Sequence, residues 1–503
     1  MKTAAAGVLS GLLFALAFPP REWVLLLPIA LIPWLVALFR EESRGRALLS
    51  GLLFGLAYWC ASIPWVIFVV TRFGGQPLSL GVVSLFLVAT ICAEWPAIVA
   101  WGVVACAPAG SWRRLAAFPI LWAASEHARS YVYGGFPWNL TAFGLYRHPL
   151  WLQAASVWGV YGVGFLVVSV SGLIAFAAVR RQIRWAGIAA AVVLLLGVAG
   201  ALALRKPSGP SRPLRVALLQ PAISQEERLA AGLDARNYHA VLEQARQAAR
   251  RKPDLIVIPE SALPIYWQTS LRLREDLTGL ARECGCTVLF NDVDFAEAER
   301  HYNAARLATS AGLAGPAYRK VHLVPFGEYV PLPKIFFWVR QVSTAVGEFS
   351  AAPEPTVLSA GALKIGVGVC YEILYPVLSW KQSRAGANLL ATISNDSWYG
   401  AAGAQAQHFA GATLRAVENR RFLLRAAITG ISGIVDEKGR IVAELSRDRR
   451  GTIFGTARLF SGRTIWNRWG FLLSAVADVL AAIVLVSGFL RWRRERRAGA
   501  KHP

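Results

Sequence analysis

Residues 364–372 read K-I-G-V-G-V-C-Y-E, an apolar run that ends in polar side chains. Its isoleucine and valines alternate with two glycines, and this period of two predicts a short buried strand. Cys370 stands at the end of that strand, where α/β sheets commonly bind ligands. A cysteine among valines is also a common small core residue, so the rest of the chain must decide between a nucleophile and a packing residue.

The chain is more apolar than an ordinary soluble protein. Its 503 residues are 55% hydrophobic, include 19 tryptophans and have a mean hydropathy of +0.43. The length leaves room for about two to four domains, and the composition predicts membrane-spanning helices among them.

Eight apolar runs are candidates for these helices. They fall at 4–18, 23–39, 46–70, 79–107, 115–128, 157–179, 185–204 and 470–490. A span needs about 20 apolar residues, so the shorter and proline-interrupted runs have loose boundaries. The first run could instead be a cleaved signal peptide ending near Ala15-Leu16-Ala17, but further runs follow at once and we favour an uncleaved helix.

Basic clusters give the helices a direction. The net charge is +23, and much of the excess lies beside apolar runs, at Arg40–Arg46, Arg113-Arg114, Arg180–Arg184 and Arg491–Arg497. Because cytoplasmic loops carry such clusters, we expect both termini inside and the segment between the seventh and eighth runs outside. Contact with anionic lipid explains this charge better than nucleic acid does, since the sequence contains no aromatic-basic recognition module.

Two features of the apolar part have a possible function. Glu94 lies mid-run in T-I-C-A-E-W-P; it is either functional or a neutral carboxyl that pins a kinked helix. The loop from Glu126-His127 to Gln153 contains G-G-F-P-W, with Trp138 at its end, and is rich in Tyr and Trp. This composition is typical of an interfacial aromatic belt, and a lipid entrance is the alternative.

The sequence pattern changes after a Pro/Ser-rich linker at 205–213. Short apolar runs then alternate with amphipathic stretches, which predicts an α/β layered domain. The expected strands are 214–219, 255–258, 287–290, 304–309, 365–369, 389–393, 424–435 and 440–445, and the expected helices are 235–251, 271–283 and 405–421. The predicted domains are a seven-helix membrane domain at 1–204, an extracytoplasmic α/β domain at 205–465, and a final helix with a basic tail at 466–503.

The six cysteines indicate neither a disulfide framework nor a metal site. Three lie in apolar runs, and Cys284 and Cys286 are too close in sequence for an easy unstrained bridge. Paired Cys/His spacings typical of zinc sites are missing from the sequence, so we expect no metal or other cofactor and a free thiol at Cys370.

Glu260, Lys320 and Cys370 stand at comparable places in the predicted α/β domain. A thiol needs a base to become a nucleophilic thiolate, and burial can raise the pKa of a carboxyl toward that task. A nearby ammonium would stabilise both the thiolate and an oxyanion. Long stretches of chain separate the three, so spacing does not show that they meet. A helix cap, a surface lysine and a core thiol are the respective alternatives.

Three motifs resemble the signatures of the nitrilase superfamily. They are P-E-S at 259–261, Y-R-K-V-H-L-V-P-F-G-E-Y-V-P at 318–331 and G-V-C-Y-E at 368–372. With the eight apolar runs and N-D-S-W-Y-G at 395–400, nearly the whole chain is similar to the apolipoprotein N-acyltransferases of bacterial envelopes. The resemblance implies a Glu-Lys-Cys triad on an α-β-β-α sandwich, held outside the cytoplasm by a bundle of about eight helices.

The resemblance also implies roles for individual residues. Glu260 would be the general base, Lys320 the oxyanion-stabilising ammonium and Cys370 the nucleophile. The implied supporting or substrate-binding residues are Trp138, Asn303, Glu328, Tyr371, Glu372 and Trp398. Among these, Glu328 matches a second essential carboxylate that orients the lysine or relays a proton. The family's tryptophan after the first domain strand has no counterpart here, and Leu229 stands near its place.

The implied reaction is ping-pong acyl transfer. Cys370 would take an acyl chain from a membrane phospholipid as a thioester and pass it to the α-amine of the N-terminal diacylglyceryl-cysteine of an apolipoprotein. The apolar arm 330–342 is either a gate on the bilayer surface or a buried loop. We expect a monomer in the bacterial inner membrane, with the catalytic domain on the periplasmic side.

Two other functions share part of this pattern. A membrane-anchored nitrilase-type amidase would use the same triad on small amides and release free acid, but would not need eight helices. A transporter whose outer domain binds ligand would use Glu94 on its pathway and would not need Cys370.

Overall fold

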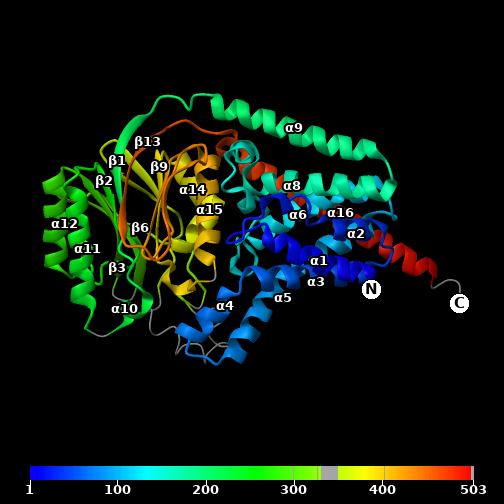
Figure 1. The fold of residues 1–503 in the computed structure, drawn as a ribbon, viewed down its shortest axis with the longest axis horizontal. Helices are drawn as coiled ribbons and strands as arrows, with labels where there is room; N and C mark the ends of the chain where they lie inside the picture. The colour runs from blue at the N-terminus through cyan, green and yellow to red at the C-terminus, as the bar shows by residue number, and fades with distance from the viewer. Residues whose placement is uncertain (231, 298–299, 326, 330–348, 402, 500–503) are drawn as a thin grey trace. The chain divides into compact units, whose positions relative to one another are not determined.

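The computed structural model describes the chain except residues 231, 298–299, 326, 330–348, 402 and 500–503 (Figure 1). The chain divides into two compact units. The first, here called the helical unit, comprises Met1–Lys206, Gly400–Ala410 and Arg468–Pro503. The second, here called the sandwich unit, comprises Pro207–Tyr399 and Gly411–Asn467.

Two β-sheets form the centre of the sandwich unit (Figure 1). The first has the strand order β13-β1-β2-β3-β4-β5, with β6 paired to β4, and the second has the order β12-β11-β10-β9-β8-β7. The first sheet contains β1 (Arg212–Gln220), β2 (Leu255–Val257), β3 (Thr287–Glu297), β4 (Arg300–Thr309), β5 (Gly312–Leu313), β6 (Tyr318–Arg319) and β13 (Gly451–Leu459). The second contains β7 (Val357–Ala360), β8 (Leu363–Val369), β9 (Leu389–Ser394), β10 (Leu423–Ala427), β11 (Ser432–Val435) and β12 (Ile441–Leu445).

The sheets are layered with helices around two apolar cores. One core joins side chains of both sheets, such as Leu218 and Ile365. The other lies between the first sheet and the helices α11 (Asp234–Ala249) and α12 (Leu271–Cys284). Helix α14 (Pro376–Arg384) packs on the second sheet, where Gln382 Nε2 donates to Val367 O at 2.8 Å. The α/β layered domain predicted from the sequence is therefore confirmed.

One predicted strand is wrong. The run 424–435 is not a single strand but the antiparallel pair β10 and β11. The chain turns between them at Gly430, whose φ of +99° suits glycine better than any other residue. The apolar run continues through this turn, so the composition did not mark it. Further elements that were not predicted are β7, β13, α10 (Gln225–Leu229) and α14, while α15 (Ala404–Asn419) matches the predicted helix at 405–421.

The helical unit contains helices at each of the eight predicted apolar runs. The helices at these runs are α1 (Lys2–Leu16), η1 (Val24–Leu26), α2 (Ile32–Arg40), α3 (Arg44–Ser62), α4 (Trp65–Phe68), η2 (Val69–Phe73), α5 (Leu78–Cys106), α6 (Trp112–Arg129), α8 (Ala155–Arg180), α9 (Ile183–Arg205) and α16 (Ile465–Gly499). Three short helices, η3 (Val132–Gly134), η4 (Thr141–Leu145) and α7 (Pro149–Leu152), lie between the fifth and sixth runs. Among the described helices, four are long and apolar enough to span a membrane, and a fifth is possible if the pair α3 and α4–η2, bent by 57°, counts as one span. Eight spans remain a prediction.

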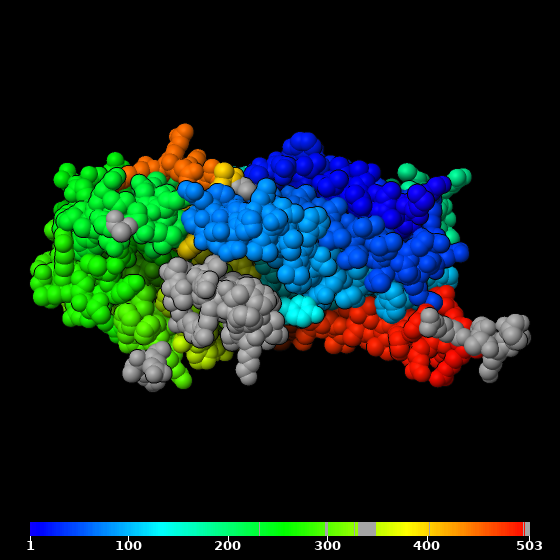
Figure 2. All heavy atoms as spheres, turned by 90° about the horizontal axis from the view of Figure 1, so that it is seen from below, coloured from blue at the N-terminus to red at the C-terminus, as the bar shows by residue number. Residues whose placement is uncertain are grey.

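The surface of the helical unit is rich in apolar side chains. Leu194, Leu195 and Ile483 are exposed on α9 and α16, and Figure 2 shows α16 in red along this unit. Such a surface is costly in water and is typical of helices that face lipid. Glu94 lies half-buried on α5, and its role stays a prediction.

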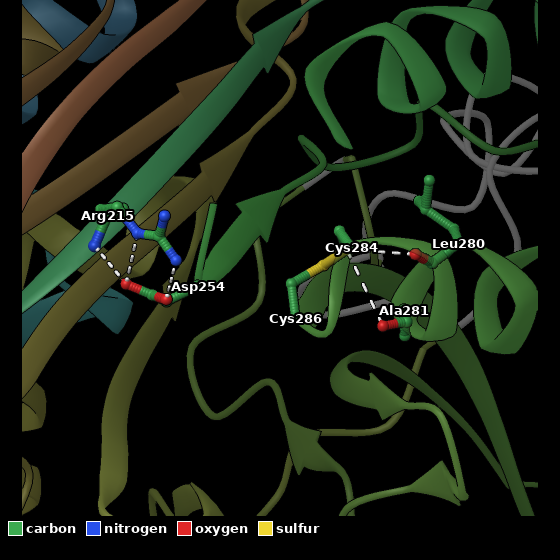
Figure 3. The surroundings of a disulfide bond; sticks show 6 residues. All are labelled: Arg215, Asp254, Leu280, Ala281, Cys284 and Cys286. Atoms are coloured by element: carbon green, nitrogen blue, oxygen red, sulfur yellow. Dashed lines mark hydrogen bonds and ion pairs between the residues drawn. A yellow bond between two sulfur atoms is a disulfide. The ribbon is translucent and has the colours of Figure 1, made fainter. Parts of the chain in front are cut away.

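The expectation that Cys284 and Cys286 remain unpaired is wrong. The two form a disulfide at the end of α12 (Figure 3). Gly285 takes the left-handed conformation at the C-cap, with φ of +66°, and turns the chain back. The Cα atoms of the two cysteines are therefore 5.2 Å apart, a separation that a disulfide accepts. The decisive feature is the glycine cap, which the spacing of the cysteines does not reveal.

The double replacement Cys284→Ser with Cys286→Ser is expected to lower the free energy of unfolding by about 1.5 kcal/mol. The effect is small for a disulfide because the bridge closes a very short loop. The melting temperature of the purified protein should fall by a few degrees, whereas Cys60→Ser, which removes a free thiol, should leave it unchanged. Mass spectrometry after alkylation checks the bridge directly. Two alkylated thiols at these positions in unreduced protein would contradict it.

Candidate active site

Cys370 has an uncommon backbone conformation at the end of β8. Its φ is +55°, in the left-handed region that few non-glycine residues adopt, and such a conformation costs about 1–3 kcal/mol. The short helix η6 (Cys370–Leu374) follows directly. The Glu372 carboxylate holds this turn by accepting a hydrogen bond from Val369 N at 2.9 Å. The thiol is thus fixed at the point where the strand stops.

Glu372 also joins β8 to the segment that carries Lys320. Its Oε1 accepts from the backbone N–H groups of Val321 at 2.6 Å and His322 at 3.0 Å, and its Oε2 accepts from Tyr318 Oη at 2.9 Å. Burial raises the pKa of Glu372 to about 7, although Lys320 and the backbone donors lower it. Glu372 therefore acts as a brace that sets the position of Lys320 relative to the end of β8.

Four of the predicted residues meet in one buried cluster. Lys320 Nζ lies 2.9 Å from Glu328 Oε1 and 2.8 Å from Glu328 Oε2. Asn303 Nδ2 lies 2.9 Å from Glu260 Oε1 and 2.8 Å from Glu328 Oε1, between the two carboxylates. The backbone N–H of Asn395 donates to Glu260 Oε2 at 2.8 Å. Asn303 thus links the predicted base to the carboxylate that holds the lysine.

Electrostatic coupling connects this cluster to Cys370. Burial raises the pKa of Glu260, and Lys320 opposes that rise. Burial acts to lower the pKa of Lys320, but Glu328, Glu260 and Cys370 outweigh it and raise the value. Burial, with Glu260 next, raises the pKa of the Cys370 thiol, which Lys320 opposes. Lys320 and Cys370 thus affect each other's pKa, both respond to Glu260, and Glu260 responds to Lys320, so the site couples a buried thiol, a carboxyl and an ammonium.

Ser394, Asp396 and Arg425 form a second group behind the thiol that the sequence analysis missed. Ser394 follows the β9 residue paired with the last residue of β8, and its side chain hydrogen-bonds Cys370. Ser394 Oγ donates to Asp396 Oδ1 at 2.5 Å, and Asp396 pairs with the fully buried Arg425. The N-D-S stretch at 395–397 was a usable signal for Asp396, but Arg425 lies far along the chain in an apolar strand.

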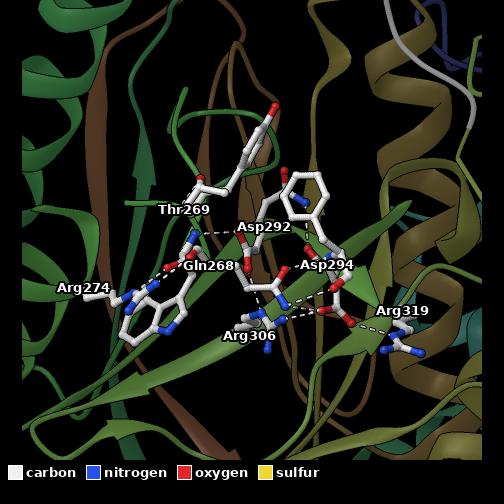
Figure 4. Close-up of polar contacts among 12 residues, drawn as sticks. Gln268, Thr269, Arg274, Asp292, Asp294, Arg306 and Arg319 are labelled. Carbon is white, nitrogen blue, oxygen red and sulfur yellow. Dashed lines mark hydrogen bonds and ion pairs between the residues drawn. The ribbon is translucent and has the colours of Figure 1, made fainter. Parts of the chain in front are cut away.

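A buried ion-pair network supports β6 next to Lys320 (Figure 4). Arg306 lies between Asp292, at 2.7 Å, and Asp294, at 2.6 Å, and Arg319 contacts Asp294 at 2.6 Å. The backbone N–H of Trp267 donates to Asp292 at 3.0 Å, which ties in the loop after Glu260. The network therefore fixes both the strand before Lys320 and the loop after the predicted base.

The remaining predicted residues lie outside these contacts. Tyr371 is buried and packs edge-to-face on Tyr375, with ring centroids 5.3 Å apart. Trp398 lies half-buried in the short helix η7 (Asp396–Tyr399). Trp138 belongs to the helical unit, where its Nε1 donates to Gln407 Oε1 at 2.6 Å. The predicted arm at 330–342 falls outside the described residues.

Known protein families match both parts of the chain. Residues 10–173 match the apolipoprotein N-acyltransferase N-terminal domain, and residues 215–463 match the carbon-nitrogen hydrolase family. An apolipoprotein N-acyltransferase of Geobacter metallireducens is 34% identical, over 96% of this chain and 95% of its own length. The chain belongs to the apolipoprotein N-acyltransferase family.

Other relatives of this family extend the comparison. The apolipoprotein N-acyltransferase of Methylococcus capsulatus is 33% identical over 93% of both chains. Among solved structures, an amidase from Nesterenkonia sp. is 21% identical, with a TM-score of 0.38, and covers 53% of this chain and 98% of its own. The assignment to the apolipoprotein N-acyltransferases rests on the sequence relatives.

Glu372→Gln is expected to destabilise the protein by about 1–3 kcal/mol, because the amide nitrogen must face a backbone N–H and leaves a buried donor unpaired. Tyr318→Phe removes one hydrogen bond and should cost less, about 1 kcal/mol. Because the folded pKa of Glu372 is raised to about 7, its contribution to stability is present at low pH and is lost as pH rises through about 7. Melting temperatures measured on both sides of that pH should differ less in Glu372→Gln than in wild type, and an unchanged difference would refute the assignment.

Proposed function

We propose that the Glu260–Lys320–Cys370 cluster transfers an acyl chain from a membrane phospholipid to the N-terminal diacylglyceryl-cysteine of apolipoproteins. Membership of the family makes the chain an N-acyltransferase with a carbon-nitrogen hydrolase fold. The observation that carries the proposal is the buried cluster in which Asn303 and Glu328 link Glu260 to Lys320, with both charges acting on the Cys370 thiol. A packing cysteine would need neither of the other two groups.

In the first half-reaction, Glu260 takes the proton of Cys370 as sulfur attacks the ester carbonyl of the phospholipid. Lys320 stabilises the oxyanion that forms. The carbon–oxygen bond then breaks, and Glu260 returns the proton to the leaving alkoxide of the lysophospholipid. An acyl thioester remains on Cys370.

In the second half-reaction, the free α-amine of the apolipoprotein attacks the thioester carbonyl. Glu260 accepts a proton from the amine, the carbon–sulfur bond breaks and the Cys370 sulfur takes that proton back. The amide is more stable than the thioester, so transfer runs downhill. Glu328 and Asn303 keep Lys320 and Glu260 in place through both steps.

We further propose that the sandwich unit works on the periplasmic side of the inner membrane, with eight spans and both termini cytoplasmic. The basic clusters that flank the apolar runs support this orientation. The Cys284–Cys286 disulfide also supports it, because disulfides persist in the periplasm and are rare in the cytosol. The proposal also includes domain limits at 1–204, 205–465 and 466–503. It describes the protein as a monomer without a nucleic-acid partner.

An amidase of small molecules is the alternative with the same cluster. The match to the N-terminal domain of the acyltransferase family over 10–173 argues against it, since a small-molecule amidase does not need that domain. The products discriminate the two: an amidase releases free acid, whereas the proposed enzyme releases lysophospholipid and N-acylated lipoprotein.

Incubation of the purified protein with phosphatidylethanolamine should give an acyl adduct on Cys370 that hydroxylamine removes. Cys370→Ser should abolish the labile adduct, and Lys320→Ala should slow its formation by a factor of about 100 or more through loss of oxyanion stabilisation. Intact-protein and peptide mass spectrometry measure both. A hydroxylamine-labile adduct on another residue would refute the nucleophile.

The pH dependence of adduct formation should follow the ionisation of the Glu260 carboxyl. The carboxylate must be ionised to accept the thiol proton, so the rate falls as pH drops through a pKa above the ordinary carboxyl value of 4.5. Single-turnover rates across pH measure this limb, and Glu260→Gln should remove it together with most of the rate. A limb near the free-thiol pKa of about 8.5 that persists in Glu260→Gln would show that the thiol ionises without this base.

A further inference from the structure

Arg228 is held beside the predicted base by contacts on two sides. It lies on α10, and its Nε donates to the carbonyl oxygen of Ser261, the residue after Glu260, at 2.9 Å. Its Nη1 donates to Gln225 Oε1 at 2.9 Å. The same Gln225 oxygen accepts from Asn395 Nδ2 at 3.2 Å, and Asn395 N is the donor to Glu260. The guanidinium is thus tied to both backbone segments that surround the Glu260 carboxylate.

The third nitrogen of this guanidinium is available to a ligand. Nη2 makes no hydrogen bond to the residues that the structure describes, and the side chain is only half-buried. The titratable groups that interact with it electrostatically are Glu260, Tyr266 and Asp234. Burial lowers the pKa of Arg228, as expected for a cation whose neighbours do not fully replace water.

Two exposed side chains with apolar surface accompany Arg228: its chain neighbour Leu229, and Tyr266, which is close enough to interact with it electrostatically. Leu229, the next residue, is 56% exposed, and Tyr266 is 38% exposed. A pre-oriented guanidinium suits a phosphate oxygen, and exposed apolar groups beside it suit the glycerol and acyl portion of a lipid. These surroundings differ from those of an ordinary surface arginine such as Arg236 on α11, which is exposed.

We propose that Arg228 binds the phosphodiester of the phospholipid acyl donor during the first half-reaction. The inference rests on the proposed function. In a glycerophospholipid the phosphate and the reacting ester share one glycerol unit, so a cation beside Glu260 can hold the phosphate while Cys370 attacks the ester. The diacylglyceryl-cysteine acceptor has no phosphate. Arg228 therefore serves the donor and not the acceptor.

A different role would be an indirect one through Glu260. The guanidinium could stabilise the Glu260 carboxylate and so change its strength as a base. That effect would act on every ester, whether or not it carries a phosphate. The two roles therefore separate when donors with and without a phosphodiester are compared.

The test measures acyl-enzyme formation in detergent-solubilised full-length protein with two donors, phosphatidylglycerol and a p-nitrophenyl ester of the same acyl chain. Arg228→Gln should lower kcat/KM for phosphatidylglycerol by a factor of roughly 10 to 100, the loss of one charge-assisted hydrogen bond. The p-nitrophenyl ester rate and the transfer from preformed acyl-enzyme to acceptor should stay within about twofold. Arg228→Lys keeps the charge without the planar fork and should fall between Arg228→Gln and wild type.

Arg236→Gln serves as the matched control and should leave both donor rates unchanged. An equal loss with both donors would overturn the inference in favour of the indirect role through Glu260, and no loss with phosphatidylglycerol would overturn it outright. A wild-type protein that forms no adduct from either phosphatidylglycerol or phosphatidylethanolamine would instead refute the proposed function. Melting temperatures of the variants show that an observed loss does not come from unfolding.

Discussion

The burial of the Lys320 ammonium is the constraint on which the site depends. Lys320 is 1% exposed, and an unpaired charge at such a depth would cost several kcal/mol. Glu328 neutralises it at 2.8 Å, and the Glu328 carboxylate is itself held by Asn303 and by the backbone N–H of Val324. The buried Lys320 therefore requires Glu328, and the buried Glu328 in turn requires its hydrogen bonds from Asn303 and Val324. The second carboxylate in the cluster, Glu260, is the proposed base, and Asn303 links it to the same contacts that keep the cation fixed.

Three further buried ion pairs, in two groups, fix the geometry around that constraint. Arg306 with its aspartates supports β6, and Asp396 with Arg425 lies behind Cys370. Buried pairs contribute little net stability, because desolvation offsets most of their attraction, but breaking one is costly. Their effect here is to define the positions of the strands that present the reacting groups. Glu372 connects the end of β8, at Val369, to the segment that carries Lys320, at Val321, and it does so through hydrogen bonds in place of an ion pair.

Local patterns explain what could be predicted from the sequence. The buried strands around Leu218 and Ile365 were predictable from apolar composition and period. The convergence of Glu260, Lys320 and Cys370 was not, because side chains from three distant segments meet only through the strand order of two sheets. The disulfide was missed for a related reason, since the left-handed Gly285 and not the cysteine spacing sets the Cα separation. The positive φ of Cys370 likewise depends on Glu372, which only the folded chain places beneath it.

A two-step transfer limits where substrate selectivity can be located. In the proposed mechanism Cys370, Glu260 and Lys320 take part in both half-reactions, so a change in any of them would affect donor and acceptor alike. Discrimination must then come from groups that touch one substrate only and act on one transition state. The donor leaves as a lysophospholipid that still carries its phosphate, so a group that holds the phosphate too tightly would retain the product. Arg228 offers the phosphate its Nη2, since Nε and Nη1 already donate to Ser261 and Gln225, and one charge-assisted hydrogen bond contributes only about 1.5–3 kcal/mol. Arg228 is therefore suited to select the donor without trapping what remains of it.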